Sequence, residues 1–169
     1  MIRFLNLIDG ASLWLARLSA VAVVLMAAGF IVALLAQVVF RYVLNIPLSW
    51  SEELATFLFV WSTLLAASYG VRRQEHLRLT FLQDVLPPTA GRALNGLCQA
   101  LIAVFGLFLI KEGWRLAELV WTNTSAAIGY PVGYLYISVP IAGGMIALHA
   151  LGCIARLIAD NDTTLGPTP

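Results

Sequence analysis

Charged residues divide the chain into four long apolar segments. Twenty-three uncharged residues separate Arg17 from Arg41, and 18 separate Glu53 from Arg72. A third segment of 18 uncharged residues ends at Lys111, and a fourth of 37 contains two prolines. A membrane-spanning helix needs about 20 apolar residues. The pattern therefore predicts an all-α integral membrane protein with four transmembrane helices, near residues 18–40, 54–71, 93–110 and 132–155.

The segments that flank these spans carry their own patterns. Residues 1–16 place polar and apolar side chains on different helical faces, which predicts an amphipathic lead-in helix. Residues 111–125 continue beyond the third span and predict an outer interfacial segment, and residues 160–169 predict a disordered tail. Together the spans and extensions form a single membrane domain, residues 1–159. The charged and aromatic residues of the interfacial segment are Lys111, Trp114, Arg115 and Trp121.

Composition supports a bilayer environment. Hydrophobic residues make up 60% of the chain and charged residues 11%, whereas soluble domains carry about 25% charged residues. The net charge is +1 with no basic stripe, so no nucleic-acid partner is expected. Membrane lipids are expected partners instead.

The distribution of basic residues predicts the orientation. Seven Lys and Arg residues fall in the two tails and the loop after the second span, and three fall on the opposite side. The positive-inside rule then places both termini of this multi-pass membrane protein in the cytoplasm. The residues expected to set this orientation and to contact lipid headgroups are Arg72, Arg73, Arg78, Arg92 and Arg156.

Two adjacent glutamates, Glu52 and Glu53, stand directly before the second span, and two interpretations of them stay open. Ser49 and Glu52 have the spacing of a capping box, and acids in a first turn favour a helix N-terminus. Alternatively, the glutamates join Arg41 and Trp50 in an outer-side cluster that fixes the first two helices and faces a partner protein.

The sequence shows no recognisable set of catalytic, metal-binding or ion-coupling residues. No Asp, Glu, Lys or Arg lies in the middle of a span, although ion-coupled transporters need ionisable or broken-helix sites there. Gln37 and Ser62 are expected to form hydrogen bonds across helices, and His149 to be a hydrogen-bonded interface histidine. No catalytic set, metal-ligand spacing or cofactor motif is recognised. The sequence therefore predicts a membrane protein that is not an enzyme and that needs no cofactor.

Two stretches resemble a known family. They are "FRYVLNIPLSWSEELATFLFVWSTLLAASYGVRRQEHLRL" and "SAAIGYPVGYLYISVPIAGG". Their order and spacing resemble the small, DctQ-like membrane subunit of tripartite ATP-independent periplasmic (TRAP) transporters. The chain departs from the family pattern after His76, where Leu77-Arg78-Leu79-Thr80 lacks the acid that often follows.

The resemblance implies a noncatalytic small permease subunit in a three-part system of the bacterial inner (cytoplasmic) membrane. Such a subunit packs on the scaffold of a large membrane subunit, one copy of each. It stabilises that subunit and helps dock a periplasmic substrate-binding protein for sodium-coupled uptake of an organic acid. The residues expected at a partner interface are Arg41, Tyr42, Trp50, Glu52, Glu53 and Trp61.

Three alternatives remain open on the residues alone. The chain could be a self-sufficient small transporter or channel acting as a homo-oligomer. It could also be a membrane enzyme or electron carrier, or a membrane-assembly factor. The missing midplane charges argue against the first, and the missing paired histidines and catalytic sets argue against the second.

Overall fold

A computed structural model describes residues 2–46, 48–73 and 88–164, and these residues are helical apart from short connections. Within them no strand forms, although Thr124 and Pro131 make one isolated antiparallel bridge. Four helices are long and apolar enough to cross a membrane, which confirms the predicted all-α class with four spans. The helices are α1 (Ile2–Tyr42), α2 (Ser49–Arg73), α4 (Pro88–Leu119), α5 (Gly133–Tyr136) and α6 (Ser138–Thr164).

The helices extend beyond the spans expected from the sequence. Helix α1 begins at Ile2, so the expected lead-in, residues 1–16, is continuous with the first span from that residue on. Helix α4 continues to Leu119, so residues 111–119 prolong the third helix and do not form a separate segment. Helix α6 reaches Thr164, so residues 160–164 are helical where a disordered tail was expected. Charged residues such as Lys and Glu are good helix formers, so they mark the edge of an apolar span without ending the helix.

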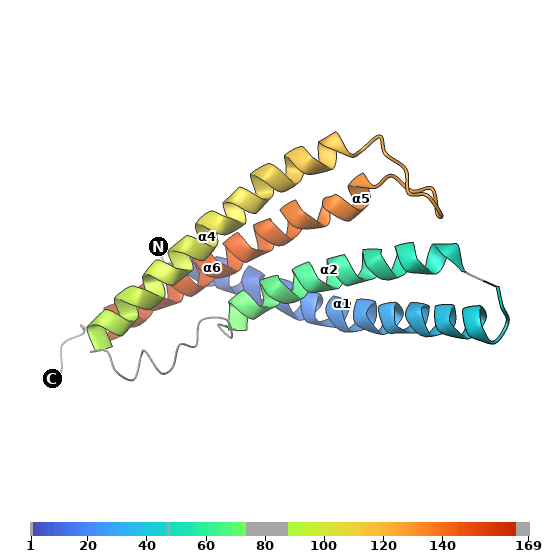
Figure 1. Cartoon of the computed structure of the whole chain (residues 1–169). Coiled ribbons are helices and arrows are strands. Elements are labelled where there is room, and N and C mark those ends of the chain that lie inside the picture. Colours follow the sequence, from blue (N-terminus) through green and yellow to red (C-terminus); the bar gives the residue numbers. More distant parts are fainter. Residues whose placement is uncertain (1, 47, 74–87, 165–169) are drawn as a thin grey trace.

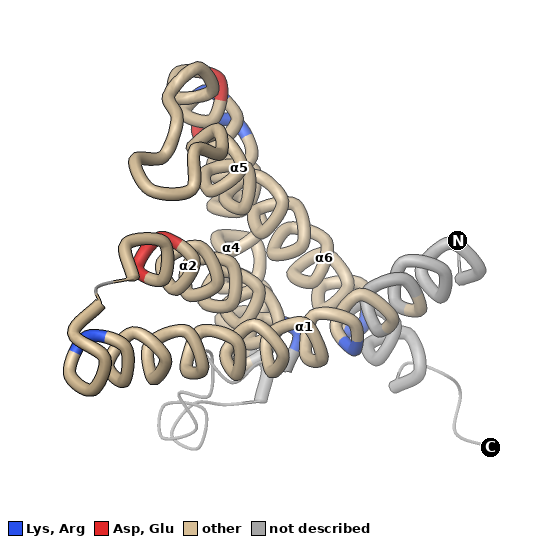
Figure 2. The backbone as a smooth tube through the Cα atoms, turned by 90° about the vertical axis from the view of Figure 1, so that its right-hand side faces the viewer, with Lys and Arg blue, Asp and Glu red and all other residues tan. Residues whose placement is uncertain are grey.

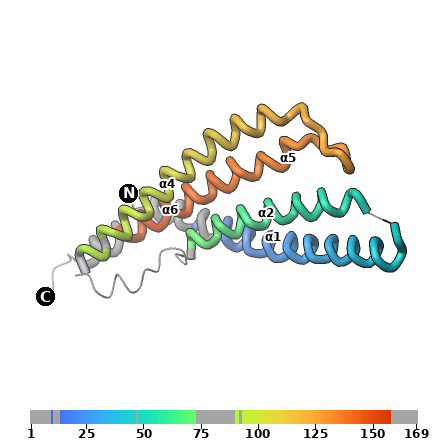
Figure 3. Tube along the Cα trace, viewed as in Figure 1, coloured from blue at the N-terminus to red at the C-terminus, as the bar shows by residue number. Residues whose placement is uncertain are grey.

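The long helices form two antiparallel pairs. Helix α1 packs along α2, and α4 packs along α6, while contacts of α6 with α2 and α1 join the pairs (Figure 1). The pairs diverge toward one end of the bundle (Figure 3). We call this the loop end, because it carries the α1–α2 turn and the loop at residues 120–132. The opposite end is the terminal end. Charged positions lie toward the ends of the apolar spans, and the middle stretches of the spans are free of them (Figure 2).

Helices α4 and α6 approach each other through glycines. A Cβ atom added at Gly106 would lie 2.8 Å from the backbone nitrogen of Ala147 and 2.8 Å from the carbonyl oxygen of Gly143. A Cβ atom added at Gly143 would lie 2.8 Å from the carbonyl oxygen of Gly106. Small residues allow membrane helices to pack backbone against backbone. The sequence therefore makes α4 and α6 one closely packed unit.

The interior of the bundle near the terminal end contains both apolar and polar buried residues. Val71, Ala103, Ile146 and Ala150 form a buried cluster from α2, α4 and α6. The helical spacing places polar residues on the same faces, and Ser68, Gln99 and His149 are fully buried.

Arg72 is also inside the bundle, with only 7% of its surface exposed. This corrects the expectation that Arg72 contacts lipid headgroups. Arg72 lies one helical turn after Ser68 and next to Val71, and that face of α2 packs against the other helices. Arg156 is exposed, as a headgroup contact requires. Arg78 lies outside the described residues, as do the side chains of Arg73 and Arg92.

Two glutamines are expected to respond in opposite ways to replacement by methionine. The amide of Gln99 is buried and makes no hydrogen bond within the described part of the chain, whereas the Gln37 amide donates to Glu52 at 2.6 Å. Burying an amide without a hydrogen bond costs about 1–3 kcal/mol. We therefore expect Gln99→Met to raise the thermal unfolding midpoint of the purified protein and Gln37→Met to lower it. A lower midpoint for Gln99→Met would show that its amide is satisfied in the folded protein.

Candidate functional site at the loop end

The loop between α4 and α5 closes on itself. The Val132 amide donates to the Asn123 carbonyl at 2.8 Å, and the Ser125 amide donates to the Tyr130 carbonyl at 2.8 Å. Gly129 at the tip has φ +79°, a conformation that glycine adopts at no steric cost. The loop is therefore a compact hairpin-like unit, and it projects from the α4–α6 pair toward α2 (Figure 1).

The carboxylate of Glu53 holds this loop against α2. It accepts hydrogen bonds from the Ser125 hydroxyl at 2.6 Å, the Ala127 amide at 2.8 Å and the Ile128 amide at 2.9 Å. The Ser125 hydroxyl in turn accepts from the Gly129 amide at 3.1 Å. Successive backbone amides form a concavity that favours an anion. We call this set of contacts the Glu53 clasp, and it joins the two helix pairs where they diverge.

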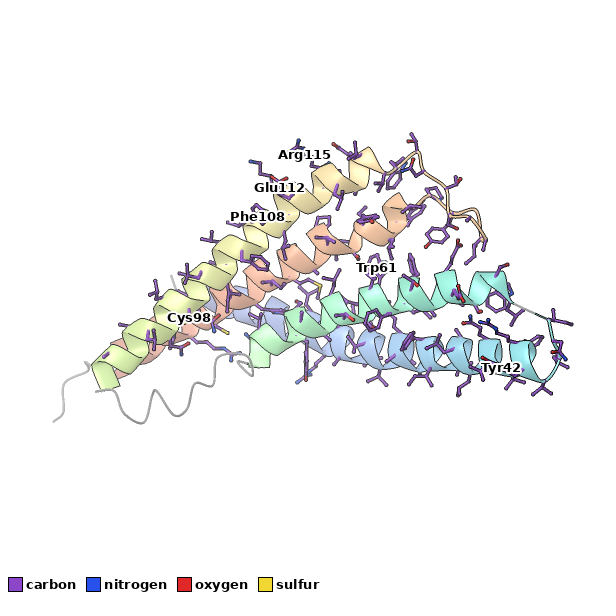
Figure 4. The ribbon with its side chains drawn as sticks, viewed as in Figure 1. Tyr42, Trp61, Cys98, Phe108, Glu112 and Arg115 are labelled. Atoms are coloured by element: carbon purple, nitrogen blue, oxygen red, sulfur yellow. The ribbon has the colours of Figure 1, made fainter. Side chains whose placement is uncertain are left out.

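Aromatic residues make further contacts at the loop end, both between α2 and residues 121–134 and within that segment. Phe57 on α2 meets Tyr130 edge to face at 5.7 Å between ring centroids, and Trp121 lies 5.2 Å from Tyr134. Trp61 points from α2 toward the other helix pair (Figure 4), and its indole nitrogen donates to the Tyr134 carbonyl at 3.3 Å. Burial raises the pKa of Tyr130, and the negative charge of Glu53 raises it further, so Tyr130 stays a neutral phenol.

An apolar pocket of about 270 Å³ opens between α2 and the loop. Phe57 and Tyr130, which stack edge to face, form part of its wall. The pocket can receive an apolar side chain or a lipid chain at the seam between the helix pairs. Its lining residues are Leu54, Phe57, Ile128, Tyr130 and Tyr134.

Glu52 points to a different side of α2. One of its carboxylate oxygens accepts from the Gln37 amide of α1 at 2.6 Å, which confirms the expected hydrogen bond of Gln37 across helices. Ser62 instead donates to the Phe59 carbonyl of its own helix, so the corresponding expectation for Ser62 was wrong. Among the described hydrogen bonds none links Ser49 with Glu52 as a capping box requires.

The predicted outer-side cluster assembles only in part. Arg41 lies 5.9 Å from the ring centroid of Tyr42 at the end of α1, and it pairs with neither glutamate among the described residues. Tyr42 is 73% exposed and Trp50 44%. The glutamates therefore fix α2 through Gln37 and the loop, and Arg41 takes no part in either contact.

The residues predicted for the outer interfacial segment have local partners. Arg115 lies 3.7 Å from Glu112, and the Trp114 indole donates to Glu118 at 2.6 Å. Lys111 is exposed, and Glu112 and Arg115 lie on the side of α4 that faces away from the other helices (Figure 4). Trp121 is exposed, and its ring lies against Tyr134.

Sequence reasoning missed Ser125, Tyr130 and Tyr134 as parts of this site. The glycine and proline of "SAAIGYP" signal a turn, but no local signal connects that turn with a glutamate 72 residues earlier. In the described part of the chain no group of His, Cys, Asp and Glu residues could hold a metal ion.

Comparison with known proteins identifies the family of this chain. The model of the DctQ component of tripartite ATP-independent periplasmic transporters matches residues 30–160. The chain belongs to this DctQ family. Members of this family are components of transport systems, so this DctQ chain is a transport component and not an enzyme. Its four candidate spans make it a multi-pass membrane protein.

Relatives of this DctQ chain include both separate and longer proteins. A putative TRAP transporter small permease protein of Haemophilus influenzae is 28% identical over 73% of this chain and 74% of that protein. The sialic acid TRAP transporter small permease protein SiaQ of Vibrio cholerae is 29% identical over 72% of this chain and 70% of its own length. The sialic acid TRAP transporter permease protein SiaT of Haemophilus influenzae is 33% identical over 64% of this chain. This match spans 18% of SiaT.

Proposed function

We propose that the chain is the noncatalytic small permease subunit of a TRAP transporter. It packs on the scaffold of a large membrane subunit, one copy of each, and stabilises it. It also helps dock a periplasmic substrate-binding protein for sodium-coupled uptake of an organic acid. Support comes from the DctQ match over residues 30–160 and from SiaT, in which a segment similar to this chain makes up 18% of a longer permease protein.

The Glu53 clasp is the observation that carries the docking role. It fixes a loop whose other side chains are largely exposed, so the loop presents a preorganised surface to a soluble partner. Preorganised loops bind with a smaller loss of conformational entropy. The excess of basic residues in the two tails and the loop after the second span supports a periplasmic loop end and cytoplasmic N- and C-termini.

Apolar helix surface supports a large membrane partner. Helices α1 and α4 expose many large hydrophobic side chains along their lengths, and lipid or a second membrane protein can cover these. We propose that the large subunit covers part of this surface and that lipid covers the rest. We propose that Glu53 and Trp61 contribute to partner contact indirectly, by holding residues 125–134 in place. The residues proposed to contact the partners directly are Arg41, Tyr42, Trp50 and Glu52.

The proposal predicts a specific complex and a specific loss of uptake. Purification of the tagged chain from native membranes in mild detergent is expected to bring one large polytopic partner in equal amount, identified by its intact mass. In cells that contain the large subunit and the binding protein, deletion of the chain is expected to abolish uptake. The purified chain alone in liposomes is the control and is expected to transport nothing. A homo-oligomer without a partner, active by itself, would contradict the proposal.

A further inference from the structure

The two adjacent glutamates have different surroundings, because successive residues of an α-helix point about 100° apart. Glu53 is engaged by three donors of its own chain. Glu52 meets only the neutral amide of Gln37, and its second carboxylate oxygen makes no hydrogen bond among the described residues. Glu52 is exposed, so its second carboxylate oxygen is accessible to a group outside this chain.

Glu52 lies at a groove between α1 and α2. The groove has a volume of about 410 Å³, and the rings of Phe30 and Phe59, 5.5 Å apart, form much of its wall. Glu52 and Thr56 are the polar groups in it. The lining residues are Phe30, Leu34, Glu52, Ala55, Thr56 and Phe59. An apolar groove with a carboxylate fits a long side chain that has an aliphatic stem and a cationic head.

No described base of this chain neutralises Glu52. Arg41, the basic residue in the last turn of α1, stacks near Tyr42. Glu52 lies in the first turn of α2, at the loop end of the second candidate span, Ser49–Arg72. The Gln37 amide also holds one carboxylate oxygen in place at 2.6 Å. A carboxylate held in this way favours a directional donor such as guanidinium over a mobile headgroup.

We infer that the α1–α2 groove is the surface on which the large membrane subunit docks, and that it receives an arginine or lysine side chain of that subunit at Glu52. This inference rests on the proposed function and names its contact surface. Glu53 then holds the loop against α2 within the subunit, and Glu52 binds the large subunit. The α4 face that carries Phe108 and Glu112 faces away from the groove (Figure 4) and provides matched control positions.

The test uses the complete complex with the large subunit present. A photo-crosslinking amino acid is placed at Phe59, which is 52% exposed in the groove, and in a control at Phe108, which is 56% exposed on α4. We expect a cross-link to the large subunit from position 59 and none from position 108. In parallel, Glu52→Gln is expected to reduce the large subunit retained at raised salt by roughly tenfold or more. The matched Glu112→Gln variant is expected to leave retention unchanged.

Each outcome decides between the inference and the proposed function. Cross-linking from position 108 alone, in an intact complex, would overturn the groove as the docking surface and leave the proposed function standing. Unchanged retention of the large subunit with Glu52→Gln would overturn the protein cation at Glu52. Loss of an amine-headgroup lipid from that variant, seen by native mass spectrometry, would then assign the carboxylate to a lipid. If the wild-type chain retains no large subunit, the proposed function itself fails, and this inference fails with it.

Discussion

Gly106→Val is expected to separate α4 from α6 and to cause a large loss of stability. Its Cβ atom would lie 2.8 Å from two backbone atoms of α6 and 3.1 Å from the Ala147 Cβ. Backbone cannot move aside as a flexible side chain can, so the helices must move apart. Overpacking alone typically costs about 1–3 kcal/mol, and separation of the helices adds the loss of packing along the pair. Thermal unfolding of the purified protein, followed by circular dichroism, measures the change.

Gly96→Ala is the matched control on the same helix. Beyond the adjoining backbone of α4 itself, no heavy atom lies within 4 Å of a Cβ atom added at Gly96. Alanine favours a helix over glycine by about 1 kcal/mol. The Gly96→Ala variant should therefore be as stable as the wild type or more so. An unchanged unfolding midpoint for Gly106→Val would mean that α4 and α6 are not in close backbone contact.

The sequence predicts the helices well because the bilayer imposes a simple length requirement. All four expected spans coincide with long apolar helices of the structure. Helix ends were predicted less well, since charged residues mark the limit of the apolar span and not the end of the helix. Residues 111–119 illustrate this, because they contain charges yet continue α4 without a break.

The candidate site was harder to predict because its contacts join residues far apart in the sequence. A capping pattern and a partner-facing cluster both fit Glu53, and neither includes Ser125, which lies 72 residues later. Arg72 illustrates the opposite difficulty. Its position after an apolar run suggested a headgroup contact, but the face of α2 on which it lies is decided by helix packing. Tertiary packing therefore determines what these charged residues do.

Glu53→Gln is expected to release the loop at residues 120–132 from α2. The wild-type carboxylate accepts from the Ala127 and Ile128 amides and from the Ser125 hydroxyl. A glutamine removes the negative charge and offers only one oxygen, so at least one of these donors loses its acceptor. Hydrogen bonds to charged acceptors are stronger than those to neutral ones. We expect amide hydrogen exchange in the loop to become roughly tenfold faster or more, measured by mass spectrometry on peptides covering the loop.

Glu52→Gln provides the matched control for Glu53→Gln, because it changes the neighbouring carboxylate and leaves the Glu53 clasp in place. Exchange in the loop of this variant should equal that of the wild type. Ser125→Ala is expected to fall between the two, since it removes one donor to Glu53 and the acceptor of the Gly129 amide. This order of effects would assign the loop's rigidity to the carboxylate of Glu53 itself.

The Glu53→Gln variant also separates the two proposed contacts of the subunit. If the fixed loop docks the binding protein, Glu53→Gln should lower uptake while the large subunit remains attached through the α1–α2 groove. Glu52→Gln should instead weaken attachment and leave the loop rigid. If loop exchange in Glu53→Gln stays at the wild-type rate, the ring contacts of Tyr130 and Tyr134 hold the loop. In that case the docking surface does not depend on the carboxylate, and the proposed role of Glu53 is wrong.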